Sequence, residues 1–126
     1  MASTARDVRL DGAAVCLSVL CLIHCLALPI AASALPVFAS ISEAEWLHKA
    51  FVLLTVPISF AAILSSLRSD IVWVFGGLVT MGIGFLIAGA FVEAWHDYET
   101  LLTVTGAVIV SIAHLLRWRH SRIVTA

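Results

Sequence analysis

Residues 13–42 read AAVCLSVLCLIHCLALPIAASALPVFASIS and contain no Asp, Glu, Lys or Arg. A helix of about 20 apolar residues crosses the hydrocarbon core of a bilayer, so this run is long enough to span a membrane. Of the 126 residues, 62% are hydrophobic and 12% are charged, whereas soluble domains carry about 25% charged residues. The sequence therefore predicts an integral membrane protein with no separate soluble domain.

Three further apolar segments follow, separated by short polar stretches. The predicted spans lie near residues 13–36, 46–67, 71–92 and 100–118. Because lipid cannot satisfy backbone polar groups, each span should be helical, and short connections favour antiparallel neighbours. We expect Pro29 and Pro36 to bend or end the first helix and Pro57 to kink the second. The predicted fold is all-α: a single domain over residues 1–126, folded as an up-down four-helix membrane bundle.

Charged residues divide between the two sides of this topology. Six of the seven basic residues fall on the side of the termini: Arg6, Arg9, Arg68, Arg117, Arg119 and Arg122. The other side carries Lys49 and the acidic residues Glu43, Glu45, Glu93, Asp97 and Glu99. The excess of basic residues predicts that both termini are cytoplasmic. A net charge of −1 gives no basic surface for a nucleic-acid partner.

The first span contains a cluster of sulfur and nitrogen donors, CLIHC at residues 21–25. Residues at i, i+3 and i+4 share one helix face, so Cys21, His24 and Cys25 should project together. Cys16 lies about 140° away from Cys21 around the helix and should point elsewhere. Two thiols and an imidazole suit soft or borderline ions such as Cu(I), Zn(II) or Hg(II). Ionisable residues at this depth are usually functional; simple packing is the alternative.

Other histidines and carboxylates extend this cluster into a path across the membrane. His48 opens the second span, and His96 and Glu99 lie among acidic residues that would concentrate cations on the outer side. His114, near the cytoplasmic end of the fourth span, would receive the ion; a hydrogen bond to Ser111 or to a neighbouring carbonyl is the alternative. The predicted metal ligands are Cys21, His24, Cys25, His48, His96, Glu99 and His114.

Small residues recur along the last two spans. Gly76, Thr80, Gly84 and Ala88 are spaced by four residues, as are Thr103, Ala107 and Ser111. Such stripes let helices approach closely. We expect them to pack within the bundle, with a homodimer interface as the alternative.

The chain resembles the MerC mercuric-transport family. The resemblance rests on CLIHCLALP (21–29), Pro36, EWLH (45–48), ETLLTVTG (99–106) and His114. It implies a multi-pass protein of the bacterial inner membrane that takes up a soft metal ion and passes it to a cytoplasmic acceptor, without an organic cofactor. Mercury-resistance members carry Cys-x-x-Cys in the first span and further cysteines near the C-terminus. Here His24 occupies the place of the second thiol and no cysteine follows Cys25, so zinc or copper is an alternative cargo.

Two other functions compete with a metal carrier. The first is electron transfer by a haem held between His24 and His114, but their expected depths differ by roughly 10 Å at 1.5 Å per residue. The second is a structural membrane subunit in which Cys21, His24 and Cys25 only pack. An enzyme is not expected, because no nucleophile, base and orienting group fall into a recognisable sequence pattern.

Overall fold

The computed structural model describes residues 2–27, 30–31, 34–35, 37 and 45–125. Its elements are α1 (Ala2–Leu22), the π-helical turn η1 (Ile23–Ala27), α4 (Glu45–Ser66), α5 (Val72–Phe91), the 3-10 segment η3 (Glu93–Tyr98) and α6 (Glu99–Thr125). Four helical segments are long and apolar enough to cross a membrane, and the described residues include no strand. The predicted all-α, four-span architecture is confirmed. Pro29, Pro36 and Glu43 lie outside the described residues.

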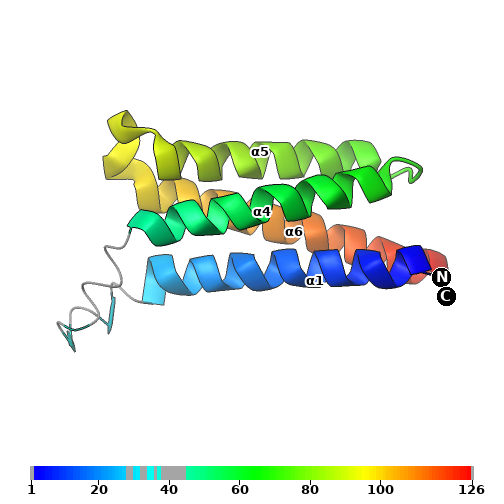
Figure 1. Cartoon of the computed structure of the whole chain (residues 1–126), viewed down its shortest axis with the longest axis horizontal. Coiled ribbons are helices and arrows are strands. Elements are labelled where there is room, and N and C mark those ends of the chain that lie inside the picture. Colours follow the sequence, from blue (N-terminus) through cyan, green and yellow to red (C-terminus); the bar gives the residue numbers. More distant parts are fainter. Residues whose placement is uncertain (1, 28–29, 32–33, 36, 38–44, 126) are drawn as a thin grey trace.

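The helices form an antiparallel bundle (Figure 1). The two ends of the chain lie at one end of the bundle, together with the turn between α4 and α5, and η3 lies at the opposite end. Helix α1 packs against α4 and α6, and α5 packs against the same two helices. This arrangement is the predicted up-down topology.

Each helix buries one side chain every three or four residues. The buried positions with this spacing are Asp11, Ala14, Ser18, Cys21 and Cys25 in the first span; His48, Val52, Thr55, Ser59, Ala62 and Ser66 on α4; Phe75, Val79, Gly82, Leu86 and Gly89 on α5; and Thr103, Ala107, Val110, His114 and Arg117 on α6. His24, Gly106 and Ala113 are buried next to members of these series. This alternation of four and three is the spacing of left-handed helix packing. Large apolar side chains cover much of the outer surface. The buried polar residues come from α1, η1, α4 and α6, and we call them the polar seam. They are Asp11, Ser18, His24, His48, Thr55, Ser59, Ser66, Thr103, His114 and Arg117.

Glycines on α5 and α6 set the closest helix contact. A Cβ atom at Gly106 would lie 2.7 Å from the carbonyl oxygen of Gly82, and one at Gly89 would lie 2.8 Å from the Thr103 side chain. By contrast, a Cβ atom at Gly76 or Gly84 would meet no atom within 4 Å.

The expectation that the stripe from Gly76 to Ala88 packs within the bundle is therefore wrong. A strict four-residue repeat advances by about 40° per step around a helix, so it drifts away from the buried positions. On α6, Thr103 and Ala107 are buried as expected. A homodimer interface on the outward stripe of α5 stays a prediction.

The observed helices are longer than the predicted spans at the end of the bundle that holds the chain termini. The first helix begins at Ala2 rather than near residue 13, and α6 continues to Thr125 rather than ending near residue 118. Within these extensions and just inside them, Asp7 and Asp11 on α1 pair with Arg117 on α6. Helix α4 continues through Pro57.

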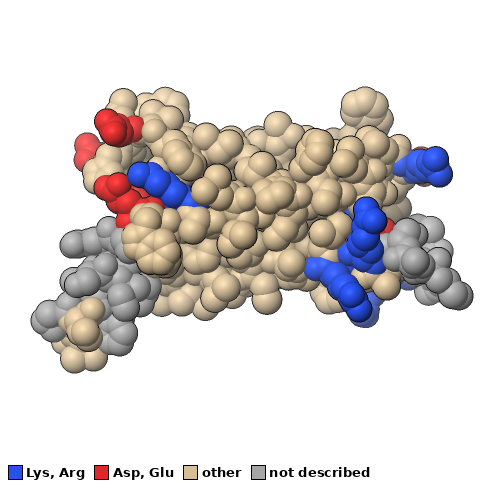
Figure 2. All heavy atoms as spheres, viewed as in Figure 1, with Lys and Arg blue, Asp and Glu red and all other residues tan. Residues whose placement is uncertain are grey.

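The charge asymmetry expected from the sequence is visible on the surface. Acidic residues gather at the end that carries η3, and basic residues gather mainly at the end that carries the chain termini (Figure 2). Lys49 is held among the acidic residues, with its Nζ 3.6 Å from a Glu45 carboxylate oxygen. We refer to these ends as the acidic end and the terminal end. Their assignment to the outside and the cytoplasm stays a prediction.

Candidate metal-binding site

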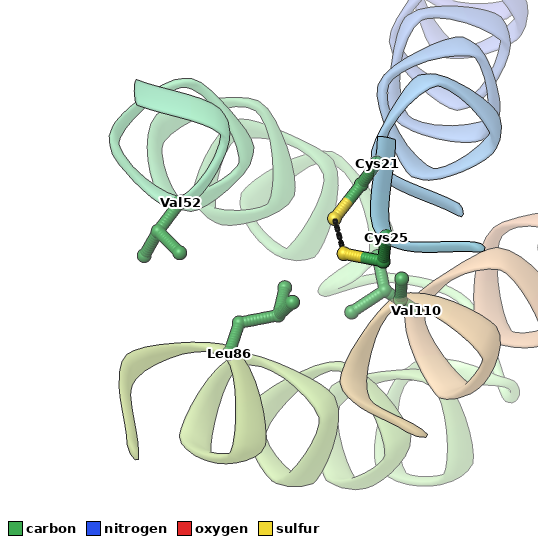
Figure 3. Packing of buried hydrophobic residues seen from close by; sticks show 6 residues of the cluster. Cys21, Cys25, Val52, Leu86 and Val110 are labelled. Atoms are coloured by element: carbon green, nitrogen blue, oxygen red, sulfur yellow. Dashed lines mark hydrogen bonds between the residues drawn. The ribbon is translucent and has the colours of Figure 1, made fainter. Parts of the chain in front are cut away.

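The centre of the candidate site is a pair of buried thiols on the first helix. Cys21 and Cys25 are 4% and 5% exposed, and their Sγ atoms lie 3.9 Å apart. Figure 3 shows both sulfur atoms turned toward each other among the apolar side chains of Val52, Leu86 and Val110. Cys16 is exposed, as the helical spacing predicted.

The distance between the two sulfur atoms can be compared with the distance expected when both bind one metal ion. Metal–sulfur bonds of about 2.3 Å at a tetrahedral angle place two thiolates roughly 3.8 Å apart, and at a linear angle roughly 4.6 Å apart. The observed 3.9 Å therefore suits a tetrahedral ion directly. A linearly coordinated ion with the same metal–sulfur bond length requires the two sulfur atoms to lie about 0.7 Å farther apart.

One thiol is connected to the acidic end through a histidine and a carboxylate. Cys25 Sγ lies 3.1 Å from His48 Nε2, and His48 Nδ1 lies 2.5 Å from Glu99 Oε1. Because the carboxylate can only accept, His48 Nδ1–H is the donor to Glu99. His48 Nε2 then either accepts the thiol proton or, once protonated, donates to the thiolate. This arrangement is suited to removing the proton of Cys25.

Glu99 connects this pair to an open cleft at the acidic end. Its second oxygen, Oε2, lies 3.2 Å from His96 Nδ1, and Glu99 stands in the first turn of α6, where the helix dipole favours a negative charge. The cleft has a volume of about 610 Å³ and is lined in part by Glu45, Glu93, His96 and Glu99. Lys49 also lines this cleft, so three glutamates and one lysine leave an excess of negative charge that attracts cations to the entrance of the site.

His24 lies beside this cluster in the π-helical turn η1. His24 and Cys25 are both buried, as their positions three and four residues after Cys21 predicted. The His24 ring meets the His48 ring edge-on, with centroids 4.7 Å apart. Among the described residues, neither ring nitrogen of His24 has a hydrogen-bond partner, although His24 is only 3% exposed. Unpaired buried nitrogens are rare and fit a group that awaits a ligand.

These donors are near one another but are not arranged around one point. Among the residues that the structure describes, no group of three or more His, Cys, Asp or Glu side chains is positioned to hold a metal ion. Two thiols alone already form a chelating pair, and a third donor would have to move toward them.

A second polar cluster lies at the terminal end of the bundle. His114 Nδ1 lies 2.7 Å from Asp11 Oδ1, and His114 Nε2 lies 3.4 Å from Ser59 Oγ. Arg117 donates to the same Asp11 oxygen at 2.8 Å and to Ser65 Oγ at 2.6 Å.

The structure thus divides the predicted ligands between two places. Cys21, Cys25, His48, Glu99 and His96 form a connected chain of contacts, and His24 touches that chain at His48. His114 lies in the second cluster, and its partners are neither Ser111 nor a carbonyl but Asp11 and Ser59. Its role as a metal ligand, like that of the other six residues, stays a prediction.

Sequence reasoning missed several residues of both clusters. Thr103 lies 3.5 Å from Cys25 Sγ, and Asp11 and Arg117 are 1% and 3% exposed. Arg117 was counted among the basic residues on the side of the termini, and Asp11 lies just before the first predicted span and was not considered. Their common signal is the alternating four-and-three spacing of the buried positions: Asp11 belongs to the same series as Cys25, and Arg117 to the same series as Thr103.

Residues 11–119 match the model of the MerC mercury resistance protein family. The chain belongs to this family. The matched segment begins at Asp11 and ends after Arg117, so it includes both polar clusters of the MerC bundle. No curated protein and no solved structure matches the chain. Family membership and the four spans together make it a multi-pass membrane protein of a mercury-resistance family.

Proposed function

We propose that this MerC protein captures a soft metal ion between Cys21 and Cys25 and carries it across the bacterial inner membrane to a cytoplasmic acceptor. The observation that carries this proposal is the buried thiol pair, 3.9 Å apart, of which one thiol is connected through His48 to Glu99 at the acidic cleft. Mercuric ion is the first candidate because of the family, and zinc or copper are alternatives because the sulfur separation fits a tetrahedral ion.

Capture requires the thiols to lose their protons. Thiolate is the metal ligand, so binding of a divalent ion follows 2 RSH + M²⁺ → M(SR)₂ + 2 H⁺. His48 is placed to take the proton of Cys25 at Nε2, while its Nδ1–H remains bonded to Glu99. Glu99 borders the cleft, so protons can leave toward the side from which the ion enters.

Additional ligands are available once the ion is between the thiols. His48 Nε2, 3.1 Å from Cys25 Sγ, and the ring nitrogens of His24, whose ring contacts that of His48, are nitrogen donors on α4 and η1. A borderline ion such as zinc accepts mixed sulfur and nitrogen ligands, whereas a linear mercuric ion needs the two sulfurs alone. The number of nitrogen ligands therefore distinguishes the cargo.

The polar seam supplies a route beyond the thiols. Ser18 and Thr55 are buried between the thiol pair and the terminal end, and Ser59 follows one turn after Thr55. Hydroxyl groups and thiols offer weak, exchangeable contacts, and conduction needs binding loose enough to allow departure. The seam thus continues from Cys21 toward the cluster that contains His114.

The test is equilibrium metal binding to the purified full chain in detergent. Wild type, Cys21→Ser, Cys25→Ser and the matched control Cys16→Ser are dialysed against Hg(II), Zn(II) or Cu(I), with a competing small thiol to remove ions held by one sulfur. We expect one ion per chain in wild type and Cys16→Ser, and loss of that ion in the other two variants. Unchanged stoichiometry in both Cys21→Ser and Cys25→Ser would overturn the proposal.

A further inference from the structure

His48 stands between the thiol pair and a carboxylate, in the arrangement that metal-bound histidines usually show. Its Nε2 atom lies 3.1 Å from Cys25 Sγ, and its Nδ1 atom lies 2.5 Å from Glu99 Oε1. A histidine that binds a metal through one ring nitrogen almost always directs the other to a carboxylate, a backbone carbonyl or a water, which fixes the ring. His48 therefore presents Nε2 to the thiol pair, and its contact with Glu99 holds the ring in that orientation.

His24 offers a further nitrogen donor beside His48. It is 3% exposed, and among the residues that the structure describes, its two ring nitrogens have no hydrogen-bond partner. Burying a polar group without a partner costs free energy, and a bound ion would give one of these nitrogens a partner. Turning the His24 ring toward an ion would break no hydrogen bond with a described residue.

The distances between neighbouring donors are close to those of a tetrahedral metal site. Zinc–sulfur bonds of about 2.3 Å and zinc–nitrogen bonds of about 2.05 Å place two sulfurs roughly 3.8 Å apart and a sulfur and a nitrogen roughly 3.5 Å apart. The observed distances are 3.9 Å between the two sulfurs and 3.1 Å between Cys25 and His48. Two imidazoles on one such ion have ring centroids about 5.2 Å apart, and those of His24 and His48 lie 4.7 Å apart.

The cluster also matches a divalent ion in charge. Metals bind cysteine as the thiolate and histidine as the neutral ring, so two thiolates, two imidazoles and a divalent ion carry no net charge together. A neutral complex suits the apolar surroundings formed by Val52, Leu86 and Val110, because an unpaired charge is costly there. Cu(I) with the same ligands would keep one negative charge. A divalent ion that prefers four mixed sulfur and nitrogen ligands therefore fits best, and zinc is the usual ion of that class.

We propose that four side chains form a tetrahedral site for a divalent ion of the zinc class: Cys21, His24, Cys25 and His48. This inference rests on the proposed capture of an ion by the thiol pair. Among the described residues, no three such side chains already surround one point, so binding requires the His24 ring to turn toward the other donors. A mercuric ion held by two sulfurs uses only half of this site, and the chain thus accepts zinc-class ions in addition to mercury.

X-ray absorption at the zinc edge tests the ligand count on the purified full chain in detergent, without any variant. We expect two sulfur ligands at about 2.3 Å and two imidazole nitrogens at about 2.0–2.1 Å from the ion. A zinc ion with fewer than two imidazole ligands, or a failure to bind zinc, would overturn the inference. The same protein loaded with Hg(II) reports on the thiol pair alone. Two sulfur ligands on mercury would leave the proposed function standing, whereas mercury without sulfur ligands would refute it.

Competition between the two ions tests the role of His24. In equilibrium dialysis with a competing small thiol, His24→Ala should weaken zinc binding at least about tenfold, because losing even an outer partner of a metal ligand costs about 10- to 100-fold. Mercury binding should weaken less, since a linear ion needs only the two sulfurs. His120→Ala removes a histidine near the end of α6 and is the matched control, with both affinities unchanged. Equal losses of zinc and mercury affinity in His24→Ala, as altered packing alone would produce, would contradict a ligand role for His24.

Discussion

Alanine substitutions at Gly106 and Gly84 test which glycines lie at the contact between α5 and α6. A methyl group at Gly106 would lie 2.7 Å from the Gly82 carbonyl oxygen and 2.9 Å from the backbone nitrogen of Leu86. Backbone atoms cannot move aside by changing a rotamer, so α5 and α6 must separate. Overpacking costs about 1–3 kcal/mol, against about 1 kcal/mol gained because alanine favours a helix over glycine. On this balance we expect Gly106→Ala to lower the free energy of unfolding by up to about 2 kcal/mol.

Gly84→Ala is the matched control, because the added methyl meets no atom within 4 Å. It should raise the free energy of unfolding by about 0.5–1 kcal/mol through helix propensity alone. Unfolding of both variants by sodium dodecyl sulfate in mixed micelles, followed by circular dichroism, measures the difference. Metal affinity should fall in Gly106→Ala only, because α6 carries Thr103 and Glu99 to the thiol site. Equal changes, or a greater loss at Gly84, would show that the observed packing of α5 is incorrect.

Three further outcomes follow from the contacts. Glu99→Gln should weaken metal binding about 10- to 100-fold, because the neutral amide can donate as well as accept and no longer fixes the tautomer of His48. His96→Gln should have the smaller effect in the same titration, and the reverse order would be contrary evidence. Lowering the pH should weaken metal binding, by up to about 100-fold per unit when two thiol protons are displaced, because protons compete with the ion; affinity that does not change with pH would contradict thiol capture. Arg117→Met should lower the free energy of unfolding by about 3–5 kcal/mol, since it leaves two carboxylates without their cation. At the exposed Arg119, the same change to methionine should alter the free energy of unfolding by less than about 0.5 kcal/mol. Similar values for the two variants would argue against the pairing of Arg117 with Asp7 and Asp11.

The fold could be predicted from hydropathy because lipid restricts the chain to helices. The limits of the helices at the terminal end could not, since Asp7 and Asp11 pair with Arg117 inside the bundle, and these charges therefore do not mark its surface. The pattern of small residues on α5 did not show which of them lie at the contact with α6. In a membrane helix both the buried and the lipid-facing surfaces tolerate glycine, and only packing shows that Gly82 and not Gly84 is at the contact.

The local part of the site could likewise be predicted, because Cys21 and Cys25 are one helical turn apart. Their partners from other helices depend on the rotation of each helix about its axis. His48 was placed at the membrane interface by its position in the chain, but the rotation of α4 turns it inward to Cys25 and Glu99. The shared face of His24 and Cys25 was predicted from the spacing, but the π-helical form of the turn was not.

X-ray absorption spectroscopy of the Hg(II)-loaded protein tests the thiol pair most directly. The measurement uses the Cys16→Ser background, so that Cys21 and Cys25 are the remaining sulfur donors of cysteine. We expect two sulfur ligands per mercuric ion, and loss of the two-sulfur signal when either Cys21 or Cys25 is also changed to serine. A bound ion with only oxygen or nitrogen neighbours, or a two-sulfur signal that survives removal of Cys21 and Cys25, would contradict capture by these thiols.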